Sequence, residues 1–364
     1  MAELIINFVN VKMNNKLIPV VLTILLSLSP VLNSKNKDKE QIQSAEYIPA
    51  IVEKTPIVPP VYISELPNIN DYDIFANSGW DGNWYVGYNV CWIEKFNIVP
   101  PSPTGTYRKA FIGAKLGRAK TMSVKDKSSW EKEPIPGDIY IGIAPSPAWK
   151  STSRFFLVSC TDIPLEGDMV NAQEGSGEAR WYWVEVPMEM VNLEGPNYVA
   201  LWSPNDYFIS RDTAPILCGG WGARGAEANT WLNNEIQGAP PIDPDDSLKT
   251  AISVFEPAIA MKLTPSDTEQ DIVVQLFDIK EGKKGTQNKT IIASISGDSI
   301  ERAWIEYAKH DLQYTKTGKF LYNPPWNFTL NPNLLPKERL FIRITAQDTW
   351  GNRGYSQPLE MEVK

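Results

Sequence analysis

Short runs in which apolar and polar residues alternate constrain the fold of this chain more than any other feature of its sequence. The clearest run places apolar side chains at every second position, in Leu340, Ile342, Ile344 and Ala346. A period of two residues is typical of a strand that buries one face. Similar runs recur through residues 84–263, and no long segment after the N-terminal region has the helical period. The sequence therefore predicts an all-β protein.

The composition supports this fold class and disfavours one class of partner. The 364 residues include 29 prolines, which fit the loops between short strands better than helix interiors. The formal net charge is −8, and no run of lysine and arginine is interleaved with aromatic residues. Because an acidic protein repels the phosphate backbone, we expect no nucleic-acid partner.

The N-terminal region has the layout of an export signal. A short positive segment precedes an apolar segment at 17–32, and small and polar residues follow. An uncleaved membrane anchor is the alternative, but the apolar segment has about 16 residues where a spanning helix needs roughly 20. Pro19 and Pro30 also interrupt it. We predict a cleaved signal peptide at 1–34, a location outside the cytoplasm (secreted or cell surface) and no membrane contact after cleavage.

The rest of the chain divides into a linker and two strand-rich regions. Residues 35–67 are charged and then rich in proline, which predicts an extended linker whose apolar patches, such as Val61 and Tyr62, could dock on a neighbouring domain. Residues 68–263 contain about eight short strand candidates with long polar loops, which suits a jelly-roll β-sandwich. A second β-sandwich is expected at 264–364.

Two resemblances agree with this division. The pattern Ala-x-Asp-x-x-Gly-Asn, formed by Ala346, Asp348, Gly351 and Asn352, resembles the closing hairpin of bacterial immunoglobulin-like domains. That resemblance implies an immunoglobulin-like sandwich that serves as a spacer or binding module in a secreted or surface protein.

The first sandwich has a looser resemblance. Its strand candidates and turns at 138–143, 183–186, 193–202, 218–221 and 229–231 follow an order similar to galactose-binding-like jelly rolls of bacterial extracellular proteins. Many such domains resemble carbohydrate-binding modules, so the resemblance implies an extracellular glycan or cell-surface polymer as the partner.

The sequence contains few residues that could support catalysis by histidine or cysteine. His310 is the single histidine, and no serine or cysteine lies in a nucleophile pattern, so we expect a surface histidine without a catalytic role. Cys91, Cys160 and Cys218 are too few and too scattered for a zinc cluster. Either Cys160 and Cys218 form a disulfide in an oxidising compartment, or all three are buried thiols.

Carboxylates offer two further kinds of site. A pair of them could perform glycoside hydrolysis, and the candidates in the first sandwich are Glu94, Glu174, Glu178, Glu185 and Glu256. Glu185 and Glu256 lie within strand patterns, where an inward carboxylate is costly unless it has a function, although both could face solvent. No pairing rule selects among them, so no catalytic residue is assigned.

A structural calcium ion is the second possibility. Asp71 and Asp73 open the first sandwich, and Asp243 and Asp245 precede its last strand. The first and last strands of a jelly roll are often neighbours, so these oxygens could converge on one Ca²⁺. As ordinary acidic loop residues they need no metal, and no other cofactor is expected.

The tryptophans give the strongest indication of binding. Sugar rings stack on exposed indoles, while carboxylates and amides bond to the hydroxyl groups. Trp80, Trp149, Trp221 and Trp231 are candidates for stacking, whereas Trp84, Trp92 and Trp202 are expected in the core. We predict a glycan platform formed by Trp80, Trp221 and Trp231, with Asp81, Asn83 and Asn229 at its rim.

Together these patterns predict a secreted or cell-surface protein that binds a glycan without catalysis, with the second sandwich as a spacer. A carboxylate-dependent glycoside hydrolase or lyase is one alternative. A purely structural surface or adhesion protein is the other. Two converging carboxylates in a groove would favour the enzyme, and exposed indoles without such a pair would favour binding.

Overall fold

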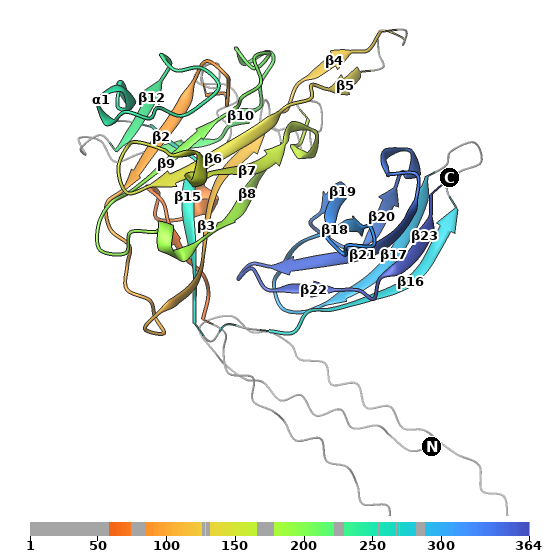
Figure 1. Cartoon of the computed structure of the whole chain (residues 1–364). Coiled ribbons are helices and arrows are strands. Elements are labelled where there is room, and N and C mark those ends of the chain that lie inside the picture. The colour runs from red at the N-terminus through yellow and green to blue at the C-terminus, as the bar shows by residue number, and fades with distance from the viewer. Residues whose placement is uncertain are drawn as a thin grey trace, which may run out of the picture. The chain divides into compact units, whose positions relative to one another are not determined.

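The structure is a computed structural model, drawn in Figure 1. It describes residues 58–73, 84–125, 128, 132–165, 178–221, 229–252, 255–266, 268, 270–281 and 288–363. All of these residues belong to one compact unit. Among these residues, helices long and apolar enough to cross a membrane are absent.

The first sandwich consists of two antiparallel sheets. One sheet has the order β1 (Val61–Ile63), β15 (Ile259–Pro265), β3 (Tyr107–Gly117) and β10 (Ile216–Leu217), and β8 (Ala179–Val186) also pairs with β3. The other sheet has the order β13 (Thr250–Ile252), β12 (Thr230–Asn233), β2 (Cys91–Phe96), β9 (Asn197–Trp202), β6 (Asp138–Ala144) and β7 (Arg154–Ser159). The all-β prediction is confirmed.

Alternation along the strands builds the core between these sheets. Ile112 and Met261 from one sheet and Ile141 and Leu201 from the other lie in the same buried hydrophobic cluster. Full burial of an aliphatic side chain of this size stabilises a fold by about 1.5–3 kcal/mol. The period of two in the sequence is therefore the pattern of side chains that point into this core.

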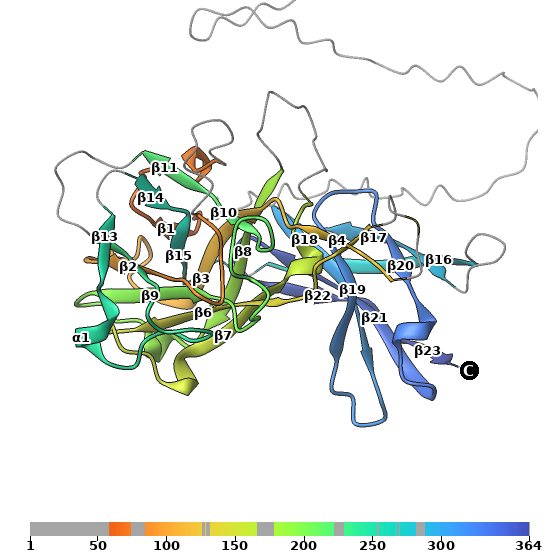
Figure 2. The same cartoon turned by 90° about the horizontal axis from the view of Figure 1, so that it is seen from above.

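Small elements extend the ends of the first sandwich. β11 (Gly219–Trp221) pairs with β14 (Phe255–Pro257) as a separate ribbon, labelled in Figure 2. β4 (Thr121–Ser123) pairs with β5 (Lys132–Pro134). Single helical turns complete the set: η1 (Ile69–Asp71), η3 (Ser151–Ser153), η4 (Cys160–Asp162), η5 (Met188–Met190) and α1 (Pro244–Ser247).

The second sandwich also has two antiparallel sheets. The first has the order β16 (Val273–Glu281), β17 (Lys289–Ser296) and β20 (Asn327–Leu330). The second has the order β19 (Thr315–Leu321), β18 (Ile300–Ala308), β21 (Arg339–Asp348) and β22 (Arg353–Tyr355), and β23 (Leu359–Glu362) also pairs with β21. The single turn η6 (Pro332–Leu334) precedes β21. The alternating apolar residues of 340–346 are buried in the core of this sandwich.

The turn after β21 explains the Asp-x-x-Gly-Asn pattern. The Asp348 carboxylate accepts hydrogen bonds from the backbone N–H groups of Trp350 at 2.9 Å and Asn352 at 2.8 Å. Gly351 has φ +80°, and a Cβ atom there would lie 2.2 Å from the ring of Phe111 in β3. Glycine is therefore required both by the left-handed backbone and by close contact with the first sandwich.

The N-terminal boundary of the first sandwich differs from the prediction. β1 lies inside the range predicted as an extended linker, and Val61 pairs with Leu263 along β15. Val61 and Tyr62 thus dock on the neighbouring domain, as their apolar character suggested. Further upstream, the Trp350 Nε1–H donates to the carbonyl of Val58 at 2.8 Å. The sequence predicted a linker here because β1 has only three residues and follows Pro59 and Pro60 directly.

A buried lysine joins the two sandwiches. Lys262 in β15 has no exposed side-chain surface, and its ammonium lies 3.1 Å from the Glu301 carboxylate of the second sandwich. The ammonium also lies 4.7 Å from the ring centroid of Phe111 and 4.9 Å from that of Trp183. A charge this deep is tolerable because it is both paired and in contact with aromatic faces.

The three cysteines are buried and free, so the suggested Cys160–Cys218 disulfide is wrong. Cys160 belongs to the main core of the first sandwich, whereas Cys218 belongs to a separate cluster that also contains Leu66 and Tyr72. Burial raises the pKa of the Cys160 and Cys218 thiols to about 12. Both therefore act as small apolar side chains, the alternative that the sequence left open.

Candidate functional site

Trp221 is the exposed indole among the predicted stacking residues that the structure describes. Its side chain is 62% exposed, and its ring centroid lies 4.3 Å from that of Phe255 on the paired strand. Phe255 contacts Trp84 edge-on at 6.2 Å, and Trp84 lies 5.0 Å from Trp92. A column of four rings thus anchors the surface indole in the core. Trp84 and Trp92 are buried, as predicted.

Two other predicted ligand residues, Trp231 and Asn229, belong to the described residues. Trp231 is partly buried and packs in the cluster on the outer face of the six-stranded sheet, together with Trp202. The side chain of Asn229 forms a hydrogen bond with Glu65. Trp80, Asp81 and Asn83 lie outside the described residues. The predicted platform therefore stays a prediction for Trp80, Asp81 and Asn83. Trp231 packs in the outer-face cluster, whereas Trp221 contacts Phe255 of the main core.

Beneath this surface, two glutamates share one hydroxyl group. Thr230 Oγ1 lies 3.0 Å from Glu94 Oε2 and 2.9 Å from Glu256 Oε2. The backbone registers explain the meeting, because Thr230 pairs with Glu94 across β12 and β2, while Glu256 lies on β14 opposite Gly220. A hydroxyl group has one proton to donate, so two full hydrogen bonds form here only when one of the carboxyl groups is protonated and donates to Thr230.

The acidities of this cluster agree with a shared proton. Burial raises the pKa of Glu94 well above its usual value, and the neighbouring Glu256 and Glu65 raise it further. Burial likewise raises the pKa of Glu256 to about 7, with a smaller contribution from Glu65. The pKa of Glu65 is also raised by burial, although its hydrogen bond with Asn229 opposes the shift. Desolvation is the largest cause in all three.

Accessibility limits what these carboxyl groups can do. Glu94 is fully buried and Glu256 is 5% exposed. A general acid must come within hydrogen-bond distance of the substrate atom that it protonates. Glu94 and Glu256 converge, as a carboxylate-dependent glycoside hydrolase requires, but they converge in the protein interior. Neither Glu94 nor Glu256 lines the pockets of about 530, 600 and 930 Å³.

The remaining acidic and histidine candidates lie elsewhere. Glu185 is partly exposed and contacts Lys109, whereas Glu178 pairs with Arg180. Glu174 is outside the described residues. His310 is exposed on the second sandwich, where the sequence placed it.

The four aspartates of the predicted calcium site have separate local partners. Asp71 lies in η1, and Asp73 pairs through its backbone with Gly219 at 2.9 Å. Asp243 caps α1 by accepting from the Asp245 backbone N–H at 2.9 Å. Within the part of the chain that the structure describes, no group of three or more histidine, cysteine or acidic side chains is placed to hold a metal ion. The calcium site stays a prediction.

A groove of about 930 Å³ lies at one end of β6 and β7. Its apolar wall includes Leu193, which is 47% exposed, and Ile242, which is 71% exposed. Glu189 and Glu194 contribute carboxylates to the lining. Its size falls within the usual range for ligand sites of roughly 300–1,000 Å³. We refer to this site as the β6–β7 groove.

Two buried donors line the β6–β7 groove without an acceptor. Trp149 Nε1 and Arg154 Nε are buried, and none of the described residues accepts a hydrogen bond from either. Trp149 is 1% exposed, so it cannot stack on a sugar, and its ring lies over Gly142, where a Cβ would approach to 3.0 Å. An unmade hydrogen bond at a buried donor costs about 1–3 kcal/mol. Because neither nitrogen is accessible, the surface that the groove offers to a ligand is formed by exposed residues such as Leu193 and Ile242.

From the sequence, Trp149 was a candidate binding residue, but the groove that it lines was not predicted. Leu193, Ile242 and Arg154 occur in turns or at a strand end, where no periodic pattern marks them. The available signal was the presence of large aliphatic residues in polar loop segments.

Comparisons with known proteins give no family for this chain. No family model matches it, and no curated protein matches it. Among solved structures, it is similar to a β-1,2-glucanase from Parabacteroides distasonis, with 13% identity and a TM-score of 0.20, over 75% of this chain and 30% of that one. It is also similar to the glycoside hydrolase domain of Endo-D from Streptococcus pneumoniae R6, with 8% identity and a TM-score of 0.17, over 74% of this chain and 34% of that one. The chain spans about a third of the length of these structures, and likeness at this level carries no argument about activity.

Proposed function

We propose that this protein is exported and binds a glycan without catalysis, and that the β6–β7 groove of its first sandwich is the binding site. The observation that carries this proposal is an open groove in which the exposed aliphatic side chains of Leu193 and Ile242 lie with two exposed glutamates, Glu189 and Glu194. The second sandwich would act as a spacer, in keeping with its resemblance to immunoglobulin-like domains.

A neutral sugar matches the chemistry of this groove. Its hydroxyl groups can donate to the carboxylates of Glu189 and Glu194, which are exposed. The C–H faces of the rings are apolar and can pack on Leu193 and Ile242. A purely apolar ligand would make no use of the two glutamates, so we favour the polyol.

A glycan array followed by calorimetric titration tests this proposal. We expect the double variant Leu193→Ala/Ile242→Ala to bind the selected glycan at least about tenfold more weakly, since loss of apolar contact on both walls removes more than 1.4 kcal/mol. Both side chains are exposed, so the fold should be unaffected. Ile98→Ala is the matched control, because Ile98 is 77% exposed and does not line the groove. Unchanged affinity in the double variant would reject the groove.

The second candidate function is a carboxylate-dependent glycosidase, which the raised pKa of Glu256 favours. The same glycan, incubated with the wild type and with Glu256→Gln, separates the two functions. Non-catalytic binding predicts intact glycan with both proteins and equal affinity. Product formation that Glu256→Gln abolishes would establish the enzyme instead.

A further inference from the structure

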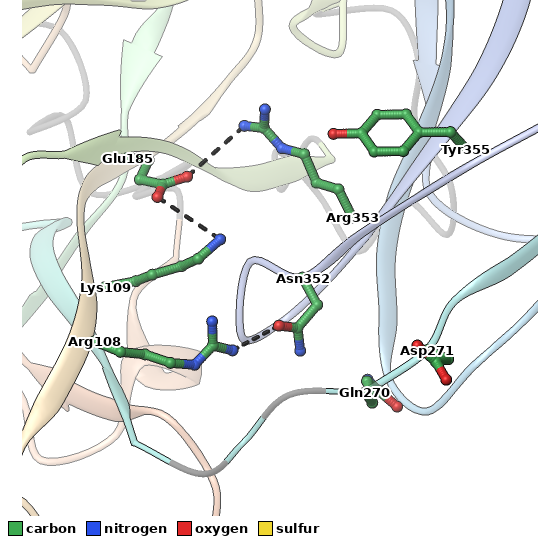
Figure 3. Close-up of a pocket in the computed structure, with 8 residues that line it drawn as sticks. All are labelled: Arg108, Lys109, Glu185, Gln270, Asp271, Asn352, Arg353 and Tyr355. Atoms are coloured by element: carbon green, nitrogen blue, oxygen red, sulfur yellow. Dashed lines mark hydrogen bonds and ion pairs between the residues drawn. The ribbon is translucent and has the colours of Figure 1, made fainter.

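A second pocket, of about 530 Å³, lies between the two sandwiches. Arg108 and Lys109 of β3 and Glu185 of β8 contribute from the first sandwich (Figure 3). Arg353 and Tyr355 of β22 contribute from the second, as do Asn352, Gln270 and Asp271. Three cationic side chains from two domains thus line one small space.

Contacts with the second sandwich hold two of these cations in place. Arg108 donates from Nη2 to Asn352 Oδ1 at 2.6 Å and from Nε to Thr268 Oγ1 at 3.2 Å. Lys109 Nζ donates to the carbonyl of Gly351 at 2.7 Å. Among the described residues, the groups that accept these hydrogen bonds from Arg108 and Lys109 are neutral, so the bonds orient the two cations without neutralising them.

One carboxylate, Glu185, forms long ion pairs with two of the three cations. Glu185 lies 3.7 Å from Lys109 Nζ and 3.9 Å from Arg353 Nη2. Both separations exceed the 2.7–2.9 Å of a direct charge-assisted hydrogen bond. Figure 3 shows Glu185 between Lys109 and Arg353, whereas the Asp271 carboxylate lies apart from them. The lining of the pocket therefore carries three cations and two carboxylates, a small excess of positive charge.

The acidity of Lys109 is consistent with this excess. Burial lowers the pKa of Lys109, and Arg108 and Arg353 lower it further by repulsion, while Glu185 and Asp348 raise it. A bound anion would offset the repulsion among the three cations. Tyr355, which is 47% exposed, adds a hydroxyl group on the side of the pocket next to Arg353.

We propose that the pocket between the sandwiches binds an oxyanion carried on a ligand of about monosaccharide size. The oxyanion takes over from Glu185 the contacts with Lys109 and Arg353, and a ligand hydroxyl group lies against Tyr355. Carboxylate, sulfate and phosphate share the chemistry that this arrangement recognises. The site does not depend on the β6–β7 groove and stands if that groove binds nothing.

Titration of the full chain with glucuronate, inorganic phosphate and glucose tests the proposal. We expect the two anions to bind, glucose not to bind, and the affinity to fall as salt concentration rises. Tighter binding of glucuronate than phosphate assigns an acidic sugar, and the reverse assigns a free anion. Absence of binding by either anion at millimolar concentration would overturn the proposal.

Variants connect the binding to this pocket. Arg353→Gln should weaken anion binding at least about fivefold, and Lys109→Met should have a similar effect. Glu185→Gln should strengthen binding about threefold or more, because it removes the competing carboxylate. Lys280→Met, a change at a lysine that is 63% exposed and outside the pocket, is the control and should leave binding unchanged. Equal affinity of the wild type, Arg353→Gln and Glu185→Gln would contradict the site, and the opposite response of these two variants cannot arise from a loss of folding.

Discussion

Two polar regions of the first sandwich contrast with each other. The carboxyl cluster of Glu94, Thr230 and Glu256 contains the residues with the most unusual acidity, yet it is buried. The β6–β7 groove contains ordinary loop residues, yet it is open and includes exposed Leu193 and Ile242. The comparison teaches that a perturbed pKa identifies a desolvated group, while only access identifies a place where a ligand can bind.

The largest expected effect is a pH dependence of the free energy of unfolding, which arises from the carboxyl cluster and not from the groove. The folded-state pKa of Glu256, about 7, exceeds its usual value of 4.5, so the native state binds more protons than the unfolded state between these values. The free energy of unfolding should therefore decrease as pH rises from about 4.5 to 7, by on the order of 3 kcal/mol. Urea unfolding of the wild type and of Glu256→Gln measures this.

Glu256→Gln should flatten that decrease, because an amide does not titrate. Leu193→Ala is the control from the groove and should keep the wild-type pH dependence. A wild-type free energy of unfolding that is constant or rises over this pH range would contradict the raised pKa of Glu256.

The next effect concerns the shared hydroxyl group. Thr230→Val keeps the shape of the side chain but removes the group that bonds to both Glu94 and Glu256. We expect a loss of about 2 kcal/mol in the free energy of unfolding, because buried carboxyl oxygens lose their partner. Glycan binding should be unchanged, since Thr230 does not line the groove. Full stability of Thr230→Val would show that the hydroxyl group does not couple the two acids.

The smallest effect concerns the groove itself. Trp149→Phe removes a buried N–H that lacks an acceptor among the described residues. The free protein should lose about 1 kcal/mol or less, since the smaller ring is offset by removal of the unsatisfied donor. Glycan affinity should be unchanged, because Trp149 is 1% exposed and its N–H is not accessible to a ligand. Thermal unfolding and titration measure the two quantities separately, and a fall in glycan affinity would show that the ligand reaches Trp149 Nε1–H.

The sequence was sufficient for the fold class but not for the sites, for a physical reason. Strands such as β21 report their burial through alternation, which is local. The meeting of Glu94 and Glu256 at Thr230 depends on contacts across 136 and 26 residues, which no local pattern encodes. β1 was not predicted because its three residues follow prolines, as residues of a linker do. Its pairing partner, β15, lies far along the chain, so no local pattern marks the strand.

The central claim is that the ligand binds in the open groove and leaves the buried carboxyl cluster untouched. NMR of isoleucine and leucine methyl groups during titration with the selected glycan tests it most directly. The account predicts shifts at Leu193 and Ile242, with Ile252, the strand partner of Thr230, unchanged. Shifts at Ile252 with none at Leu193 and Ile242 would contradict it.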